Sequence, residues 1–200
     1  YDEPSHGRYL CHLGLGYSYR TDTTVVEFDT ISELGNQGGF LATTVPGDRD
    51  YSIFAPEFLV IWGRASVQSE FVFVPTGAAD FYSGYVEASY FLTPGHRGYK
   101  RSTKEVSKPV ILEDFFTIRS PGGLCFGRGG WELKTRWSYV DLLDGAGPDR
   151  GTQNNWSAGL NWYLNPYTRI MFDYVYEDVN RLTAADGQTH NFGTRLQVHW

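Results

Sequence analysis

Charged side chains at every second position are the first feature of this sequence with chemical consequences. Basic and acidic residues share the polar face of several alternating segments: Lys134, Arg136, Arg169, Arg195, Glu70, Glu87, Glu132 and Asp173. Fixed charges in a narrow passage with a low-dielectric wall focus the electric field and select ions. We therefore predict that these side chains line a pore. The basic side chains either bind an anion at successive positions along the pore wall, or form ion pairs with the acidic ones and stiffen the wall. We favour the ion pairs.

A second group of basic residues lies close together in the chain. It consists of Arg97, Lys100, Arg101, Lys104 and Lys108, interrupted only by Glu105. Guanidinium and ammonium groups can replace the hydration water of an anion. We predict an anion-binding loop here.

Enzymatic and metal chemistry have no sequence signature in this chain. Nucleophile elbows, zinc-protease motifs and phosphate-binding loops do not occur. The five histidines lack the spacing of metal ligands, so we expect no metal site, no cofactor and no enzyme activity. Cys11 falls in an alternating apolar set and Cys125 in a Gly-rich connection, and we expect two unpaired thiols rather than a disulfide.

The elements that must position these residues are strands, because apolar and polar residues alternate with a period of two. Strong alternation occurs in residues 8–20, 130–142, 155–165, 168–179 and 189–200, and weaker alternation in 24–33, 53–63, 65–74 and 82–92. Segments of roughly 10–12 residues exceed the usual strand of about 5–6 and suit a strand that crosses a bilayer at a tilt. Aromatic residues near the strand ends fit an interfacial girdle. The pattern predicts an all-β, antiparallel transmembrane barrel with about nine strands present.

Connection lengths indicate how such strands are oriented. Residues 63–64 and 165–167 are short, whereas 35–50, 144–154 and 180–188 are long and polar. Short periplasmic turns and long external loops are typical of outer-membrane barrels. If the C-terminus is periplasmic, counting strands backward from it places residues 93–129 on the side of the short periplasmic turns. A further strand within 110–118 would change this count.

Composition narrows the class of protein. The chain has 200 residues and a formal net charge of −6, which argues against a nucleic-acid binder. It contains no run of 18 apolar residues that would form a transmembrane helix. The alternative to a channel is a secreted, aromatic-rich β-sandwich that binds carbohydrate by ring stacking. Solubility without detergent would favour that alternative.

Two segments carry a resemblance to a known family. They are Gly130-Trp131-Glu132-Leu133, continuing through Arg136-Trp137-Ser138-Tyr139, and Gly159-Leu160-Asn161-Trp162-Tyr163-Leu164-Asn165-Pro166, followed by Arg169-Ile170-Met171. Weaker similarity occurs at Gly84-Tyr85 with Ala88-Ser89-Tyr90-Phe91-Leu92-Thr93, at Gln68-Ser69-Glu70-Phe71 and at Gly7-Arg8-Tyr9-Leu10. These residues resemble the C-terminal half of the phosphate-selective porin O and P family of outer-membrane porins.

The resemblance implies a fold, a location and partners. It implies that residues 1–200 are the C-terminal portion of a single barrel domain of roughly 16 strands, in a homotrimer in the bacterial outer membrane. Outer-membrane lipid and small ions, phosphate among them, would be its partners, whereas nucleic acid would not. The last residues on one face resemble the C-terminal signal that the barrel assembly machinery reads: Phe192, Leu196, Val198 and Trp200. The resemblance implies passive diffusion of small hydrophilic solutes. The family name also implies phosphate selectivity, but the acidic net charge of the chain does not favour it.

Overall fold

The computed structural model of the chain describes residues 1–199 except 23–24, 36–38, 47–48, 121 and 184. In this part of the chain, fourteen strands and one short 3-10 turn (η1, Glu3–Ser5) form the regular structure. The described residues contain no helix that is long and apolar enough to span a membrane. The predicted fold class, all-β and antiparallel, is confirmed.

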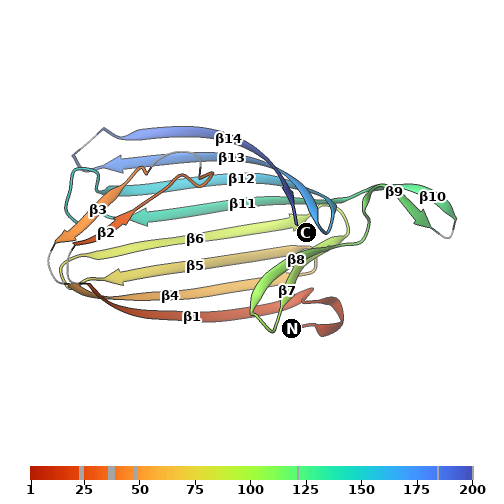
Figure 1. Cartoon of the computed structure of the whole chain (residues 1–200), viewed down its shortest axis with the longest axis horizontal. Coiled ribbons are helices and arrows are strands. Elements are labelled where there is room, and N and C mark those ends of the chain that lie inside the picture. Colours follow the sequence, from red (N-terminus) through yellow and green to blue (C-terminus); the bar gives the residue numbers. More distant parts are fainter. Residues whose placement is uncertain (23–24, 36–38, 47–48, 121, 184, 200) are drawn as a thin grey trace.

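Eight long strands form one antiparallel sheet (Figure 1). Their order is β1 (Tyr9–Asp22), β4 (Arg49–Trp62), β5 (Ala65–Pro75), β6 (Asp80–Phe91), β11 (Gly130–Asp141), β12 (Gly151–Asn165), β13 (Thr168–Arg181) and β14 (Gly187–Val198). The shortest has 11 residues and the longest 15, enough to cross a bilayer at a tilt. β1 and β14 are the edges of the sheet, and among the described residues each has a strand partner on one side only.

The two faces of this sheet differ in chemistry. The register keeps alternate residues aligned across the strands, so that Trp137 lies opposite both Val86 and Trp156. The face that contains these residues, here called the outer face, keeps large apolar side chains in the open, such as Leu13 at 75% exposure and Phe192 at 80%. The opposite or inner face carries the predicted charged residues. A water-soluble sheet would hide its apolar face, and this sheet exposes it.

One hairpin covers the inner face near the long connections. It is formed by β2 (Val25–Asp29) and β3 (Ala42–Pro46), and Val26 and Val45 are buried against the sheet, in one cluster with Phe81. We predicted residues 24–33 as a strand of the sheet, and this was wrong. Alternating apolar residues suit a strand that packs on a sheet as well as one within it, and β2 has only five residues. Position 24 lies outside the described residues.

Two further hairpins lie in the connection between β6 and β11, residues 92–129. β7 (Gly95–Lys100) pairs with β8 (Glu105–Ile111), and β9 (Phe115–Ser120) pairs with β10 (Gly123–Arg128). The first hairpin lies over the inner face, where Tyr99 joins a small buried cluster with Leu59 and Ile61. The second projects beyond the end of the sheet (Figure 1). The extra strand predicted within 110–118 is the end of β8 and the start of β9, and neither joins the sheet.

The predicted sidedness of the connections holds for the sheet. Turns 63–64 and 166–167 lie at the same end as residues 92–129 and the end of β14, because the register joins Phe91 to Glu132 and Thr168 to Val198. The sheet has eight strands rather than about nine, since residues 24–33 leave it. A β-sandwich would need two packed sheets, whereas the described residues form one large sheet with three two-stranded hairpins.

Candidate functional site: a charged belt on the inner face

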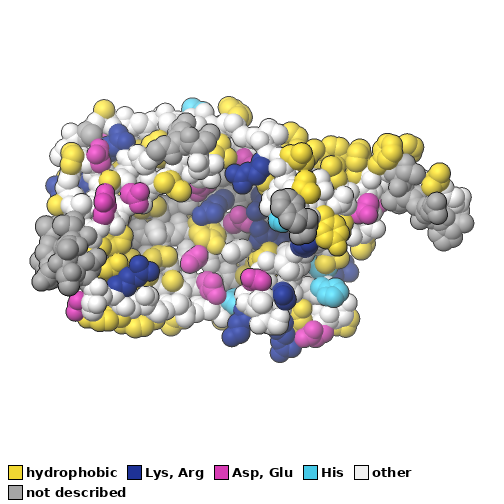
Figure 2. Space-filling model, viewed as in Figure 1, with side chains coloured by type: hydrophobic (Ala, Val, Ile, Leu, Met, Phe, Trp, Pro, Cys, Tyr) yellow, Lys and Arg dark blue, Asp and Glu magenta, His cyan; other side chains and the backbone are white. Residues whose placement is uncertain are grey.

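Charged side chains from six strands gather in the middle of the inner face, and we call this group the charged belt. It consists of Glu57, Glu70, Glu87, Glu132, Lys134, Arg136, Arg169, Asp173, Glu177 and Arg195. All eight polar-face residues predicted from alternation are among them. Figure 2 shows basic and acidic side chains together in the hollow of this face. Apolar clusters under the β2–β3 and β7–β8 hairpins lie on either side of the belt.

Arg97 of β7 reaches into the belt from the hairpin above it. Its guanidinium contacts the Glu87 carboxylate, lies 3.6 Å (Nε to Oε1) from Glu132, and donates to Gln68 Oε1 at 3.2 Å. Lys134 Nζ lies 3.0 Å from the same Glu87 oxygen. The Arg97 and Glu87 side chains are 12% and 14% exposed, so this pair is largely shielded from water. Sequence spacing assigned Arg97 to an anion-binding loop, whereas the structure pairs it with carboxylates of the sheet.

Glu132 is the most enclosed carboxylate of this group. Its side chain is 2% exposed and its Oε2 accepts hydrogen bonds from Asn161 Nδ2 at 3.0 Å and Tyr163 OH at 2.7 Å. A buried carboxylate is tolerated when neighbouring donors and a cation stabilise its charge. Arg97 is therefore one of the groups that surround the buried Glu132 carboxylate.

Glu33, in the loop that follows β2, also contacts residues of the belt and of the neighbouring strands. Its carboxylate accepts hydrogen bonds from Ser138 Oγ at 2.6 Å and from Ser157 Oγ, and its Oε1 lies 3.5 Å from Arg136 Nε. Its backbone N–H donates to the buried Glu177 at 3.1 Å. Sequence analysis missed this role, because residue 33 was placed at the end of a predicted strand. No local pattern marks a loop carboxylate that reaches a distant arginine.

The remaining cations of the belt differ in their surroundings. Arg169 donates to Gln197 Oε1 at 2.9 and 2.7 Å and to Tyr163 OH at 3.4 Å. The Arg136 guanidinium lies 4.0 Å from the centre of the Tyr85 ring. Arg195 is exposed, and no carboxylate of the described residues lies within ion-pair distance of it. Arg195 is thus the belt cation most open to a passing solute.

The structure separates the five basic residues of the predicted anion-binding loop. Arg97 and Lys104 line a cavity of about 310 Å³ between the β7–β8 hairpin and the sheet. Lys100, Arg101 and Lys108 line a different cavity, with Tyr1 and Glu3. Arg101 pairs with Glu3 at 2.9 Å in an exposed contact, and Lys108 Nζ lies 4.1 Å from the Tyr167 ring centre. Anion binding at these residues stays a prediction.

A polar contact fixes the β7–β8 hairpin to the edge strand β1. The Tyr99 hydroxyl lies 2.6 Å from His12 Nδ1, and His12 Nε2 lies 3.0 Å from Glu57 Oε1. Burial, and then the nearby Glu57 charge, raise the pKa of the Tyr99 hydroxyl above its ordinary value. Tyr99 therefore stays protonated and neutral near pH 7.

Two cavities show what the belt offers to a solute. One of about 510 Å³ lies between the residues around β2 and the sheet, and its lining includes Phe28, Glu70 and Arg136. A smaller one of about 190 Å³ is lined by three basic and three acidic side chains, Lys134, Arg136, Arg195, Glu33, Glu87 and Asp173. Among the described residues, no group of three or more His, Cys, Asp or Glu side chains is placed to hold a metal ion. The belt offers mixed charge in a water-accessible setting.

The other predicted residues lie on the outer face or outside the belt. Phe192, Leu196 and Val198 are exposed on the outer face of β14, and Trp200 lies outside the described residues. Cys11 is exposed on the outer face of β1, and Cys125 is exposed in β10.

An antiparallel sheet of long strands, apolar on one face and charged on the other, is the construction of a porin-type outer-membrane channel. Residues 7–200 match the family described as phosphate-selective porin O and P. A protein of Caulobacter vibrioides, described as uncharacterized, is 35% identical to this chain over an aligned length of 213 residues. The alignment covers 98% of this chain. The chain belongs to the phosphate-selective porin O and P family. It spans about 40% of the length of that relative.

Proposed function

We propose that the complete protein is a passive porin of the outer membrane, through which small hydrophilic solutes and ions diffuse. The observation that carries the proposal is the opposite chemistry of the two sheet faces. The outer face exposes Leu13, Trp137 and Phe192, which suit lipid, and the inner face carries the charged belt, which suits water. A passive channel needs no catalytic group, which agrees with the family.

The open edges of the sheet support a barrel that is larger than this chain. Among the described residues, β1 and β14 are not paired with each other. Unpaired backbone N–H and C=O groups are costly in hydrocarbon, so a sheet that spans a membrane must close. We infer that strands outside this chain pair with both edges, and that residues 1–200 are the C-terminal part of one barrel. The greater length of the Caulobacter relative is consistent with this inference.

The ion pairs of the belt support weak rather than strong ion selectivity. Arg97, Lys134 and Arg136 each lie within 4 Å of a carboxylate oxygen, so their charges are partly neutralised. Selectivity for phosphate or other anions would depend on cations without such partners, of which Arg195 is the clearest example. We therefore propose general diffusion as the main function, with Arg195 as the first residue to examine for anion preference.

The test is the reversal potential of the complete protein in a planar bilayer under a KCl gradient, followed by addition of phosphate. A general porin gives a small reversal potential and little block by millimolar phosphate. Anion preference with phosphate block, lost in Arg195→Ala and kept in Arg101→Ala, would establish the anion-selective alternative. A protein that forms no channels would contradict the proposal.

Assembly remains part of the same proposal. The exposed apolar side chains at the end of β14 suit recognition by the barrel assembly machinery, and the family resemblance implies a homotrimer. Deleting the last residues of the chain should reduce the amount of folded protein in the outer membrane, without changing the amount synthesised.

A further inference from the structure

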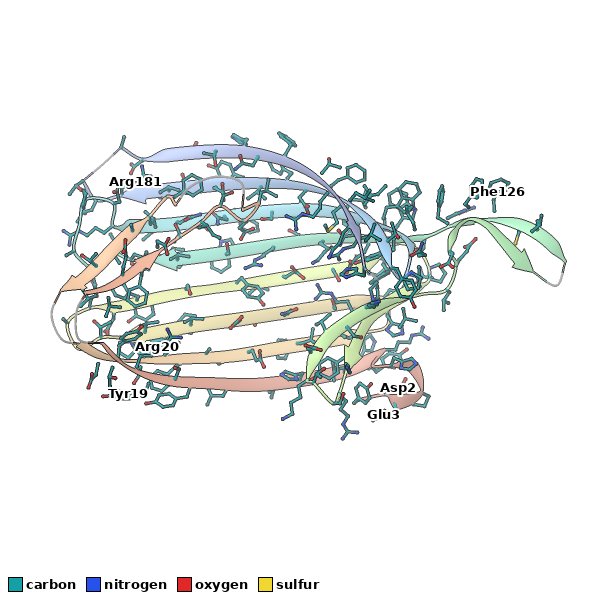
Figure 3. The ribbon with its side chains drawn as sticks, viewed as in Figure 1. Asp2, Glu3, Tyr19, Arg20, Phe126 and Arg181 are labelled. Carbon is teal, nitrogen blue, oxygen red and sulfur yellow. The ribbon has the colours of Figure 1, made fainter. Side chains whose placement is uncertain are left out.

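The β9–β10 hairpin carries an apolar surface that no other described part of the chain covers. Its exposed apolar side chains are Phe115, Phe116, Leu124 and Phe126, and the exposed Leu112 lies just before the hairpin. Phe126, at 76% exposure, points away from the sheet at the projecting end of the molecule (Figure 3). Figure 2 shows apolar side chains along this projection that continue from the main body. Large apolar patches of this kind mark contact with another molecule or with lipid.

The root of the hairpin is attached to the outer face of the sheet. Phe115 packs edge-on against Trp162, with 4.7 Å between ring centres, and Trp162 stacks on Trp131 at 4.9 Å. Both indole N–H groups donate to the backbone oxygen of Arg128, at 3.2 Å from Trp131 and 3.0 Å from Trp162. Trp131 and Trp162 are a cross-strand pair whose positions alternate with those of the charged belt. The apolar surface of the hairpin is thus continuous with the outer face and separate from the belt.

The position of this attachment indicates what covers the hairpin. Trp residues at the ends of transmembrane strands lie at the level of the lipid headgroups. A hairpin with six-residue strands is roughly 20 Å long. The exposed apolar side chains of the hairpin continue from this Trp pair and from the outer face, which faces lipid in the proposed barrel. Arg128, exposed at its root, suits a lipid phosphate.

We propose that the β9–β10 hairpin is a lipid-contacting flap, which places Phe116, Leu124 and Phe126 at the headgroup–acyl boundary of the phospholipid leaflet on the side of the short turns. This inference rests on the proposed function, because it needs the outer face to contact lipid. Amphipathic elements at that boundary are held by burial of their apolar side chains and by contact of cations with phosphate.

The two natural cysteines provide the test and its internal reference. A fluorophore is attached to Cys125 of the complete protein in phosphatidylcholine vesicles, with every other cysteine changed to Ser. A second sample carries the fluorophore at Cys11, on the outer face of β1. Each sample is exposed to lipids brominated near the headgroup and to aqueous iodide. We expect brominated lipid to quench both fluorophores at least twofold, with iodide having little effect at Cys125.

Three other outcomes would overturn the inference, and they are distinguishable. Quenching at Cys125 by iodide but not by brominated lipid, with Cys11 still quenched by lipid, places the hairpin in water. Shielding of Cys125 from both quenchers, with excimer emission from pyrene at that site, means that a second copy of the chain covers it. Absence of lipid quenching at Cys11 as well contradicts the proposed function itself.

A variant pair tests the side chains directly. Leu124→Ser with Phe126→Ser should reduce lipid quenching at Cys125 by about half, because fewer apolar groups hold the hairpin in the leaflet. Ile31→Ser is the control, since Ile31 is an apolar side chain at 65% exposure that lies in the loop after β2, away from the hairpin. Unchanged quenching in the double variant would contradict the proposed contact.

Discussion

The two hairpins of the connection 92–129 leave the sheet from the same place and go to opposite faces. The β7–β8 hairpin lies over the inner face and is held by Arg97 at the Glu87 and Glu132 carboxylates. The β9–β10 hairpin projects beyond the end of the sheet, and its root is held at the outer face by Phe115 against Trp162. Gly129, in the left-handed region at φ 69°, allows the sharp turn by which the chain returns from the second hairpin into β11. The two hairpins are thus attached by different chemistry, one by ion pairs on the inner face and the other by aromatic packing on the outer face.

The energetic basis of the two attachments also differs. A shielded ion pair contributes little net stability, but loss of one partner leaves the other charge buried. Loss of an aromatic contact has no such penalty, because it leaves no unpaired buried charge. The inner hairpin should therefore be sensitive to single charge changes, and the outer hairpin should not.

The largest effect is expected for Arg97→Ala. Glu87 and Glu132 would lose a cation while remaining poorly hydrated, which costs about 3–5 kcal/mol for a buried pair. The β7–β8 hairpin should leave the inner face, lowering the thermal midpoint in detergent and raising single-channel conductance. Arg101→Ala is the control, because its pair with Glu3 is exposed and its removal should change neither quantity. Equal behaviour of the two variants would remove the distinction between the hairpins.

A smaller effect is expected for Phe115→Ala at the root of the outer hairpin. The edge-to-face contact with Trp162 contributes about 0.5–1.5 kcal/mol beyond its buried area. The emission of Trp131 and Trp162 should change, while conductance should stay at its original value because the hairpin lies outside the belt. A change in conductance would mean that this hairpin enters the solute path.

The smallest effect is expected for Tyr99→Phe and concerns pH. The hydroxyl contact with His12 contributes about 0.5–1.5 kcal/mol. Because the pKa of Tyr99 is raised above 10.0 in the folded chain, the neutral hydroxyl is favoured there, and its contribution is complete below pH 10. It is lost as the pH rises through the higher pKa of the folded state. The thermal midpoint should fall above pH 10 in the parent protein and fall less in Tyr99→Phe.

Alternation in the sequence was sufficient to predict the long strands and the two faces of their sheet. Residues such as Glu70 and Arg136 could be assigned to one face without coordinates, because the period of two fixes the side of every residue in a strand. Local patterns could not reveal which strands join the sheet. Val26 and Phe28 alternate as a sheet strand does, yet they belong to a hairpin whose partner, β3, follows after twelve residues.

Contacts between distant segments also escaped prediction. The basic residues from Arg97 to Lys108 are close in sequence, but in the folded β7–β8 hairpin they line two different cavities. Glu33 and Arg136 are 103 positions apart and meet only because the loop after β2 folds over the sheet. Such a contact depends on the tertiary path of the chain, which no short pattern encodes.

The central claim is that the inner face meets water and the outer face meets lipid, and neighbouring residues of β5 test it most directly. Glu70→Cys and Phe71→Cys differ by one position and by face. A charged, membrane-impermeant thiol reagent is added to each variant of the complete protein in a planar bilayer. We predict that current falls in Glu70→Cys and is unchanged in Phe71→Cys. Reaction at position 71, or its absence at position 70 in a conducting channel, would contradict the account.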